Sequence, residues 1–224
     1  MNTAVLVFAQ SASKEASRKN IRSGQSLFKA LTNHTLSEVK KAGLPYYHFK
    51  ENVQEGATFG ERFANAVQHL FNKGFENIIT IGNDCPQLNF EHLLDTASKL
   101  SSGQNVIAPS TDGGFNLLGI QKEAFNKEAF IDFSWQTNGL FNETLTYFRK
   151  LGHQPTLLDT LSDLDSLADV YGLLHKVKLS SKKLYLVLKN LVENKSVGWS
   201  YSIQRTATFS INLPFNKGSP FLCA

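Results

Sequence analysis

Short apolar runs alternate with amphipathic stretches along most of the chain. The first run, at residues 4–9, is continuous rather than alternating, which is typical of a strand buried on both faces of a parallel sheet. A late run at 206–213 alternates polar and apolar residues, which predicts a strand at a sheet edge. The predicted strands are 4–9, 46–49, 78–82, 106–109, 117–120, 155–158 and 206–213.

Between these runs, apolar residues recur at helical spacing. Thr58 and Glu61 have the spacing of a capping box, which predicts a helix that ends at Gly74. Asn89 is expected to cap another helix, with an apolar face made of Phe90, Leu93, Leu94, Ala97 and Leu100. The remaining predicted helices are 26–41, 139–150 and two runs within 168–192, while 125–133 stays unassigned. Strands that alternate with helices predict an α/β domain.

Residues 10–19 follow the first predicted strand, and their composition predicts a small, basic loop. Lys14, Arg18 and Lys19 can pair with phosphates there, Arg as a bidentate fork and Lys as a point charge. The segment lacks the glycines of a phosphate cradle, however. A solvated loop that binds nothing is equally consistent with this composition.

Composition narrows the class of protein. The chain has 224 residues and 24.9 kDa, with 42% hydrophobic and 19% charged residues, which suits one soluble α/β domain. A net charge of +4 favours anionic substrates, but there is no Lys/Arg run with interleaved aromatic residues, so we expect no nucleic-acid partner. Two cysteines cannot form a disulfide framework or a Cys-rich zinc site. We expect no membrane span and no signal peptide, and therefore a cytoplasmic location.

Acidic residues follow two of the predicted strands. Asp84 comes directly after the run at 78–82, and Asp112 follows 106–109 in a turn with Gly113 and Gly114. In open α/β sheets, ligands bind at the carboxyl ends of the strands. The glycines let the backbone approach a ligand closely, or simply adopt positive φ. The two acidic turns predict a polar pocket that uses a metal ion.

Three further features each have a functional and a structural interpretation. Gly56 and Gly60, around the start of a helix, can form an anion site or meet the geometry of the helix entry. Trp135 can stack on a ligand or fill the core. Asp163 and Asp165 can hold a cation, or stabilise the dipole of the helix that follows them.

The order of these motifs is more specific than any one of them. The motifs are Gln54-x-Gly56 with Phe59-Gly60-Glu61-Arg62, Ile81-Gly82-Asn83-Asp84-Cys85-Pro86, Asp112-Gly113-Gly114-Phe115, Trp135-x-Thr137 and Asp163-Leu164-Asp165-Ser166. In this order they resemble an uncharacterised bacterial family that is described as glycosyltransferase-like and placed in the nucleotide-diphospho-sugar transferase superfamily. The resemblance covers roughly Val5 to Val170 and is fairly specific for the fold, but much less specific for a reaction.

The resemblance implies the GT-A fold, a three-layer α/β/α sandwich with a mostly parallel mixed sheet. It implies a nucleotide along the carboxyl edge of that sheet, with Mg²⁺ or Mn²⁺ on its phosphates, because two hard carboxylates suit these ions. The metal residues implied are Asp84, Asp165 and Asp163, and the catalytic residues are Asp84 and Asp112. The substrate-binding residues implied are Gln54, Gly56, Gly60 and Arg62 near the nucleotide, Gly113 and Gly114 near the acceptor or sugar, and Trp135.

The first loop departs from the relatives that the resemblance identifies. Many of them carry a Lys-Thr-Arg triplet in a glycine-containing loop, where this chain has Glu15-Ala16-Ser17-Arg18-Lys19. We expect Arg18 or Lys19 to substitute for the triplet as a substrate-binding residue. If neither does, the grip on a triphosphate is lost and the protein binds without catalysing.

Two functional hypotheses follow. The first is a metal-dependent transferase that uses a nucleotide sugar, or a nucleoside triphosphate as the less favoured donor, with an unknown small-molecule acceptor. The second is a non-catalytic nucleotide-binding protein that keeps the fold. We expect 1–170 to be the nucleotide-binding domain and 171–224 to add helices and an edge strand to it, either completing the sheet or forming a homodimer surface.

Other enzyme classes are poorly supported. No G-x-G-x-x-G follows the first predicted strand, which argues against an ordinary dinucleotide-binding protein. Cys85 lies in an acidic turn that disfavours its thiolate, and no G-x-S-x-G elbow is present.

Overall fold

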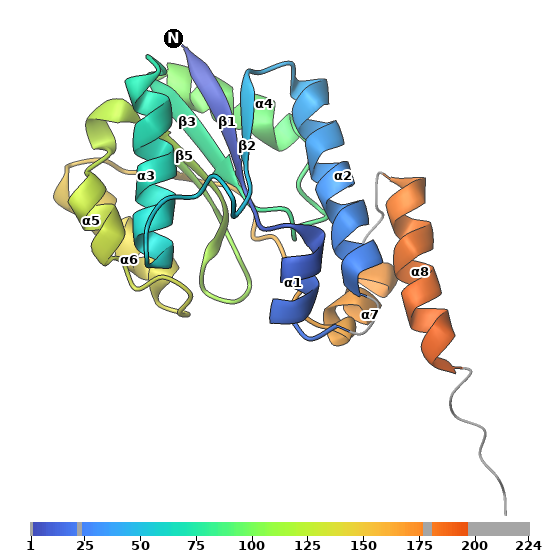
Figure 1. The fold of residues 1–224 in the computed structure, drawn as a ribbon. Helices are drawn as coiled ribbons and strands as arrows, with labels where there is room; N and C mark the ends of the chain where they lie inside the picture. The colour runs from blue at the N-terminus through green and yellow to red at the C-terminus, as the bar shows by residue number, and fades with distance from the viewer. Residues whose placement is uncertain (1, 22–23, 177–180, 197–224) are drawn as a thin grey trace, which may run out of the picture.

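A six-stranded sheet forms the centre of the molecule (Figure 1). The computed structural model describes residues 2–21, 24–176 and 181–196. The strand order is β2-β1-β3-β5-β4-β6. The strands are β1 (Thr3–Phe8), β2 (Tyr46–Phe49), β3 (Asn77–Ile81), β4 (Val106–Pro109), β5 (Phe115–Gln121) and β6 (Thr156–Leu157). Among them, β5 runs antiparallel to both of its neighbours, while β1 pairs in parallel with β2 and β3, and β4 pairs in parallel with β6.

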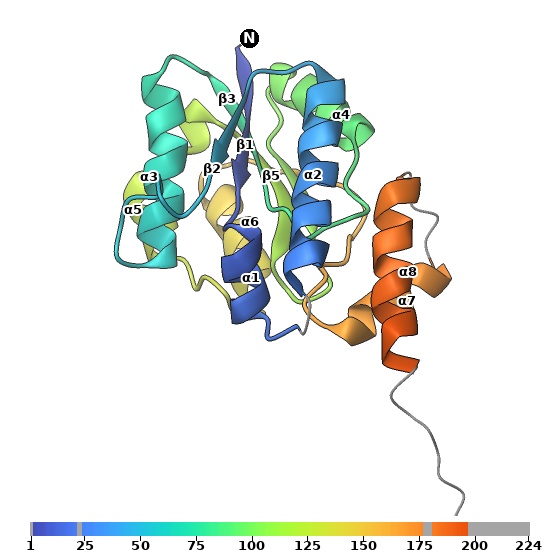
Figure 2. The ribbon, with the colours of Figure 1, turned by 45° about the vertical axis from the view of Figure 1, so that its right-hand side comes forward.

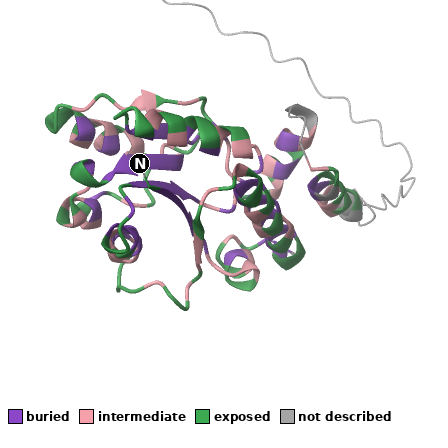
Figure 3. Ribbon diagram, turned by 90° about the horizontal axis from the view of Figure 1, so that it is seen from above, coloured by how far each residue is buried: buried purple, intermediate pink, exposed green. Residues whose placement is uncertain are grey.

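Helices cover both faces of this sheet. Helices α3 (Phe59–Asn72), α5 (Lys127–Asp132) and α6 (Leu140–Lys150) pack on one face, and α2 (Gly24–Ala42) and α4 (Phe90–Ser101) pack on the other. Figure 3 shows the strands buried between helices whose outer sides are exposed. The predicted three-layer α/β/α sandwich with a mostly parallel mixed sheet is confirmed.

The first strand shows why its apolar run is continuous. Ala4 and Leu6 pack into the layer of α3, α5 and α6, whereas Val5 and Val7 pack into the layer of α2 and α4. All four side chains are fully buried. A strand covered on both faces needs apolar residues at every position, as the pattern predicted.

The predicted helix starts are confirmed at the level of single hydrogen bonds. Thr58 and Glu61 form a capping box at the start of α3, with Glu61 N donating to Thr58 Oγ1 over 3.1 Å. Asn89 caps α4, as predicted. Leu94, however, was wrongly assigned to the buried face of α4, because its side chain is 43% exposed.

The segment after β1 was wrongly predicted to be a loop. It forms helix α1 (Ala12–Arg18), in which the Glu15 side chain is buried and accepts from Arg18. Ala12 and Ala16, one turn apart, pack against a third apolar cluster that includes Ile21, Leu27 and Phe28. Such small contact residues produce little hydrophobic periodicity, which is why the pattern did not predict a helix.

Two C-terminal helices extend that third cluster. Helices α7 (Leu167–Lys176) and α8 (Lys182–Ser196) lie beside α2, away from the sheet, in both Figure 1 and Figure 2. Leu184 and Leu188 are buried against α2, and Leu191 packs on the same cluster, which confirms the predicted face. The predicted strand 206–213 lies outside the described residues. Among the described helices, none is both long and apolar enough to cross a membrane.

The unassigned segment 125–133 contains α5, which follows a short 3₁₀ helix at Lys122–Ala124. Asn126 caps α5 by accepting from Ala129 N over 2.9 Å. Phe130 from this helix is fully buried against α3. The segment therefore belongs to the core layer that backs the functional site.

Candidate functional site

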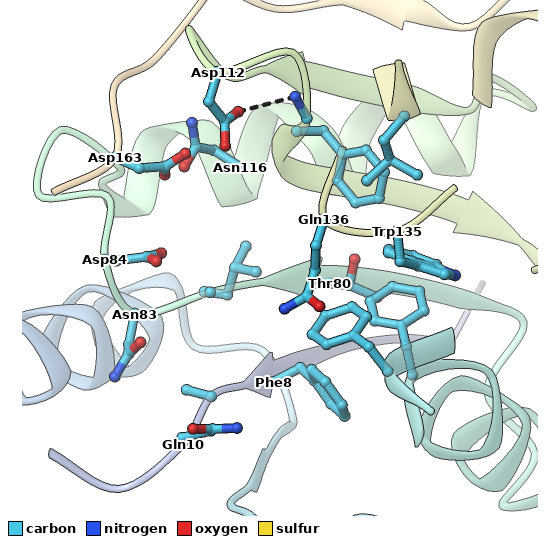
Figure 4. Close-up of a pocket in the computed structure, with 18 of the residues that line it drawn as sticks. Phe8, Gln10, Thr80, Asn83, Asp84, Asp112, Asn116, Trp135, Gln136 and Asp163 are labelled. Atoms are coloured by element: carbon cyan, nitrogen blue, oxygen red, sulfur yellow. Dashed lines mark hydrogen bonds between the residues drawn. The ribbon is translucent and has the colours of Figure 1, made fainter. Parts of the chain in front are cut away.

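A cavity of about 580 Å³ opens at the carboxyl ends of β1 and β3. Its walls come from these strands, from the turn between β4 and β5, from the loop before α6 and from the segment before α7. Figure 4 shows acidic side chains on one side of the cavity and aromatic side chains on the other. This is the sheet edge at which the sequence predicted a ligand site.

The acidic wall brings together four carboxylates from three separate segments of the chain. Asp84, Asp112, Asp163 and Asp165 all line the cavity. Backbone hydrogen bonds hold their segments together: Leu164 N donates to Asp84 O over 2.9 Å, and Thr111 N donates to Leu161 O over 3.1 Å. The acids that the sequence marked as catalytic or metal-binding therefore share one wall.

The surroundings of Asp163 oppose its ionisation. Ser110 Oγ donates to its Oδ2 over 2.5 Å. Burial first, and then the charge of Asp84, raise the pKa of Asp163 to about 7, with smaller contributions from Asp112 and Asp165. Burial and, second, the neighbouring charge of Asp84 therefore keep this carboxyl group partly in its neutral form near pH 7.

Lys19 supplies the main internal counter-charge. Its Nζ donates to Asp84 Oδ2 over 2.8 Å and to Leu164 O over 3.0 Å, and pairs with Asp165 Oδ1 over 2.8 Å. Its side chain is only 3% exposed. Burial acts to lower the pKa of Lys19, but the two carboxylates outweigh this effect and the pKa is raised. With three N–H groups already used, Lys19 has no donor left for a phosphate.

Arg18, the other residue expected to replace the missing triplet, does line the cavity. Its NH2 donates to Glu15 Oε2 over 2.9 Å, while its side chain stays 46% exposed. Arg62 also lines the cavity, and its NH1 donates to Ala57 O over 2.9 Å. The two arginines come from α1 and α3, on opposite sides of the end of β1.

The proposed anion site at the start of α3 is largely occupied by the protein itself. Glu61 accepts from Ala57 N over 2.6 Å and from Thr58 N over 3.1 Å. Gly56 has φ +135°, and a Cβ there would overlap Glu61. Gly60 does not carry positive φ, but a Cβ there would overlap Ile131 O and the ring of Trp135. These contacts support the structural interpretation of both glycines.

Gln54 and the glycines of the acidic turn also have structural contacts. Gln54 lines the cavity, and its Nε2 donates to Phe49 O over 2.9 Å. Gly113 has φ +92°, and a Cβ there would overlap Asn138. Gly114 N donates to Asp112 Oδ1 over 2.9 Å. The turn thereby fixes the Asp112 carboxylate and packs against the loop before α6.

Trp135 has the packing role, one of the two that its sequence context allowed. Its ring centroid lies 4.6 Å from that of Phe63 and 5.1 Å from that of Phe59. Its Nε1 donates to Phe130 O over 2.6 Å. It also lines the cavity with Phe8 and Phe115. Trp135 is therefore a packing residue of the aromatic wall, with one side toward the cavity (Figure 4).

Sequence reasoning missed several polar residues of the cavity. Gln10, Asn83, Asn116 and Gln136 line it and are labelled in Figure 4. Gln136 has φ +63°, which is uncommon for a residue other than glycine. Asn116 lies within the apolar run of β5, and a single polar residue in such a run was the available signal.

Two carboxylates of the acidic wall are the residues that could hold a divalent cation. In the part of the chain that the structure describes, no three His, Cys, Asp or Glu side chains are arranged to hold a metal ion together. Mg²⁺, however, is commonly bound by one or two carboxylates, with phosphates and water as its other ligands. Asp84 and Asp163 each have one oxygen engaged, by Lys19 and Ser110, and offer Oδ1 for this purpose.

The family described as "Uncharacterized protein conserved in bacteria (DUF2064)" matches residues 26–137, which are 112 of the 224 residues. The chain belongs to this family. Its predicted resemblance to an uncharacterised bacterial family is thereby confirmed. No curated protein matches the sequence.

The fold is also found in solved structures. A candidate nucleotide-diphospho-sugar transferase from Desulfovibrio desulfuricans G20 superposes with a TM-score of 0.77 and 19% identity, over 87% of this chain and 98% of that one. A glycosyltransferase involved in glycosylation of the major capsid of PBCV-1 superposes with a TM-score of 0.46 and 12% identity, over 71% of this chain and 81% of that one. Rv0371C in complex with manganese, from Mycobacterium tuberculosis H37Rv, superposes with a TM-score of 0.47 and 12% identity, over 79% of this chain and 100% of that one. The first superposition confirms the predicted GT-A type of fold.

Proposed function

We propose that this protein is a transferase that uses a nucleotide-activated donor, with a nucleotide sugar as the favoured donor and a small molecule as the acceptor. The observation that supports the proposal is the meeting of Asp84, Asp112 and Asp163 on one wall of a cavity at the carboxyl edge of β1 and β3. The family and the fold are consistent with this class of chemistry.

Asp84 and Asp163 are the residues that we propose hold Mg²⁺ or Mn²⁺, through their Oδ1 atoms. Asp165, the partner of Asp84 in the sequence-based prediction, is instead proposed to orient Lys19, with which it is ion-paired. When bound, the cation neutralises negative charge on the departing diphosphate. Its own charge would also favour the ionised form of Asp163.

The remaining residues of the cavity are given roles by their positions. Arg18 and Arg62 are proposed to contact the phosphates from either side of the end of β1. Asp112, which has one oxygen fixed by Gly114 N, is proposed to accept the proton of the acceptor hydroxyl on its other oxygen. The aromatic wall of Phe59, Phe115 and Trp135 would exclude water from the reacting groups.

Charge supports a nucleotide sugar over a nucleoside triphosphate. Among the described residues that line the cavity, Arg18 and Arg62 are the cationic side chains. Lys19 is held by two carboxylates and a carbonyl oxygen. A triphosphate carries more negative charge than a diphosphate and needs more positive charge around it.

The engaged state of Lys19 also supports the alternative of a non-catalytic nucleotide-binding protein. Nucleotide binding without turnover would then be the outcome of any assay. The cytoplasmic location, the division at residue 170 and a homodimer through the C-terminal residues stay predictions from the sequence.

Thermal shift with nucleotides tests the proposal. We expect nucleotide sugars or nucleoside diphosphates to raise the melting temperature in the presence of Mn²⁺, and Asp84→Asn to abolish the shift. Asp159→Asn, which changes an exposed acid outside the cavity, is the matched control and should behave as the unmodified protein. Nucleotide shifts that are equal with and without Mn²⁺, or that survive Asp84→Asn, would contradict the proposal.

A further inference from the structure

Asn116 occupies a break in the pairing of β4 with β5. Ala108 pairs with Leu117, and the next residue of β4, Pro109, pairs with Phe115. One step along β4 thus corresponds to two along β5, and Asn116 is the extra residue. Such β-bulges are found next to active sites, where they re-aim a side chain. Here the bulge brings an amide to the wall of the cavity.

The side chain of Asn116 is buried without being satisfied. The residue is only 6% exposed, and its Nδ2 has no hydrogen-bond partner among the described residues. Burying an unpaired amide donor costs stability, and most buried polar groups in native proteins are paired. A donor that stays unpaired on a cavity wall is explained most simply by a ligand that supplies the missing acceptor.

The surroundings of this donor specify the acceptor. Figure 4 shows Asn116 on the acidic side of the cavity, which Asp112 also lines, and an ionised carboxylate can only accept hydrogen bonds. A bare anionic oxygen at this position would be repelled by the Asp112 carboxylate. A hydroxyl group accepts one hydrogen bond and donates another, so it matches an amide donor next to a carboxylate acceptor.

We propose that Asn116 is a specificity-determining residue that donates from Nδ2 to a hydroxyl oxygen of the ligand, while Asp112 accepts from the same hydroxyl. The identity of the ligand rests on the proposed function: the hydroxyl belongs either to the sugar of the donor or to the acceptor. In both cases the pair recognises a polyhydroxyl group and discriminates against a nucleotide that lacks it.

The variant Asn116→Leu separates this role from a structural one. It removes the unpaired donor and keeps the number of side-chain heavy atoms, and the cavity leaves room for the larger methyl groups, so the melting temperature of the free protein should stay the same or rise. A structural role predicts the opposite. Asn105→Leu is the control, because Asn105 Nδ2 is also buried and unpaired in the described part of the chain, but Asn105 does not line the cavity. Since Asn105 Oδ1 accepts from Gln121 N, this control should lose stability and keep its ligand preference.

Binding is measured by calorimetry with Mn²⁺, using UDP-glucose against UDP and GDP-mannose against GDP. If the hydroxyl belongs to the donor sugar, Asn116→Leu weakens the binding of the nucleotide sugar by roughly threefold to tenfold, the value of one hydrogen bond. The affinity for the diphosphate then stays unchanged. If the hydroxyl belongs to the acceptor, the variant binds the nucleotide sugar and the diphosphate with unchanged affinity. It then no longer binds methyl α-glucoside when saturated with the diphosphate.

The outcomes that overturn the proposal are distinct from those that overturn the function. Normal binding of all probes by Asn116→Leu, or equal weakening of nucleotide sugar and diphosphate, contradicts the role of Asn116. A marked loss of stability with unchanged discrimination assigns the residue a structural role. Failure of the unmodified protein to bind any of the nucleotides contradicts the proposed function itself.

Discussion

Asp163 is a carboxyl group that the fold keeps partly protonated near neutral pH. Burial and the charge of Asp84 raise its pKa from an ordinary value of 3.8 to about 7. Between these two values the folded state holds a proton that the unfolded state has lost. Stability therefore falls as the pH rises through this window, and the penalty is complete above about pH 7.

We predict that Asp163→Asn removes this fall in stability. The variant should be more stable than the unmodified protein at pH 8, and close to it at pH 4, because its amide cannot ionise. The difference at pH 8 should be a few kcal/mol at most, since a tenfold change in proton affinity corresponds to about 1.4 kcal/mol. Urea unfolding between pH 4 and pH 8 measures it, and parallel pH profiles for the two proteins would show that Asp163 is not responsible.

Lys19 neutralises part of the acidic wall through its ion pairs with Asp84 and Asp165. We predict that Lys19→Met lowers the free energy of unfolding by about 2 kcal/mol, because Asp84 and Asp165 lose the ammonium that pairs them. The expected loss is below that of a fully buried pair because the Asp165 side chain is 53% exposed. Mn²⁺ should restore part of the loss.

Lys14→Met is the matched control for this prediction, since Lys14 is an exposed lysine on α1, the helix that ends just before Lys19. Denaturant titrations should find little change in the control. Equal stability of the two variants would mean that the Lys19 ion pairs contribute nothing net.

The sequence could predict the acids of the site but not the partner of Lys19. Asp84 and Asp112 follow strands, and their shared sheet edge was predictable from that position. Lys19 lies 65 residues from Asp84 and 145 from Leu164, whose oxygen also accepts from it. No periodicity or spacing predicts a contact of that range, so Lys19 was assigned to phosphate instead.

At the scale of elements, prediction succeeded where a cap and a wide apolar face occur together. Helix α3 has both, and its capping box and buried face were predicted correctly. Helix α1 has neither a side-chain cap nor a wide face, and was taken for a loop. It becomes a helix because Ala12 and Ala16 pack against residues that follow later in the chain.

Two glycine substitutions test how elements are joined. Gly60→Ala should destabilise the protein by about 1 to 3 kcal/mol, because a Cβ would overlap Ile131 O and Trp135, where α3 meets α5 and the aromatic wall. Gly172→Ala is the control within α7, where a Cβ has no described atom within 4 Å. It should stabilise the protein by about 0.5 to 1 kcal/mol through helix propensity. Thermal unfolding measures both changes, and a neutral Gly60→Ala would show that the aromatic wall can shift.

At the scale of the whole molecule, the layers could be predicted but the strand order could not. Continuous apolar runs indicated a sheet covered on both faces, and the resemblance implied its type. The insertion of β5 between β3 and β4, antiparallel to both, depends on pairing between distant strands. The bulge at Asn116 lies in the pairing of β4 with β5, and the pattern of apolar residues does not predict such a break in register.

The same arrangement gives the cavity its two walls. The carboxyl end of β3, the turn between β4 and β5 and the 161–166 segment bring the acids to one side, and α3 with the loop before α6 brings aromatic rings to the other (Figure 4). In the proposed function, the donor phosphates and a cation would lie at Asp84 and Asp163, a substrate hydroxyl at Asp112 and Asn116, and apolar parts of the substrates along the aromatic side.

Calorimetric titration of Mn²⁺ in the presence of UDP is the most direct test of this account. The comparison is between the unmodified protein and the variants Asp84→Asn, Asp163→Asn and Asp165→Asn. We predict that Asp84→Asn and Asp163→Asn weaken Mn²⁺ binding by at least about tenfold, as loss of a charged ligand implies, while Asp165→Asn retains it. Mn²⁺ binding that survives the first two substitutions, or that depends on Asp165 alone, would contradict a cation held by Asp84 and Asp163.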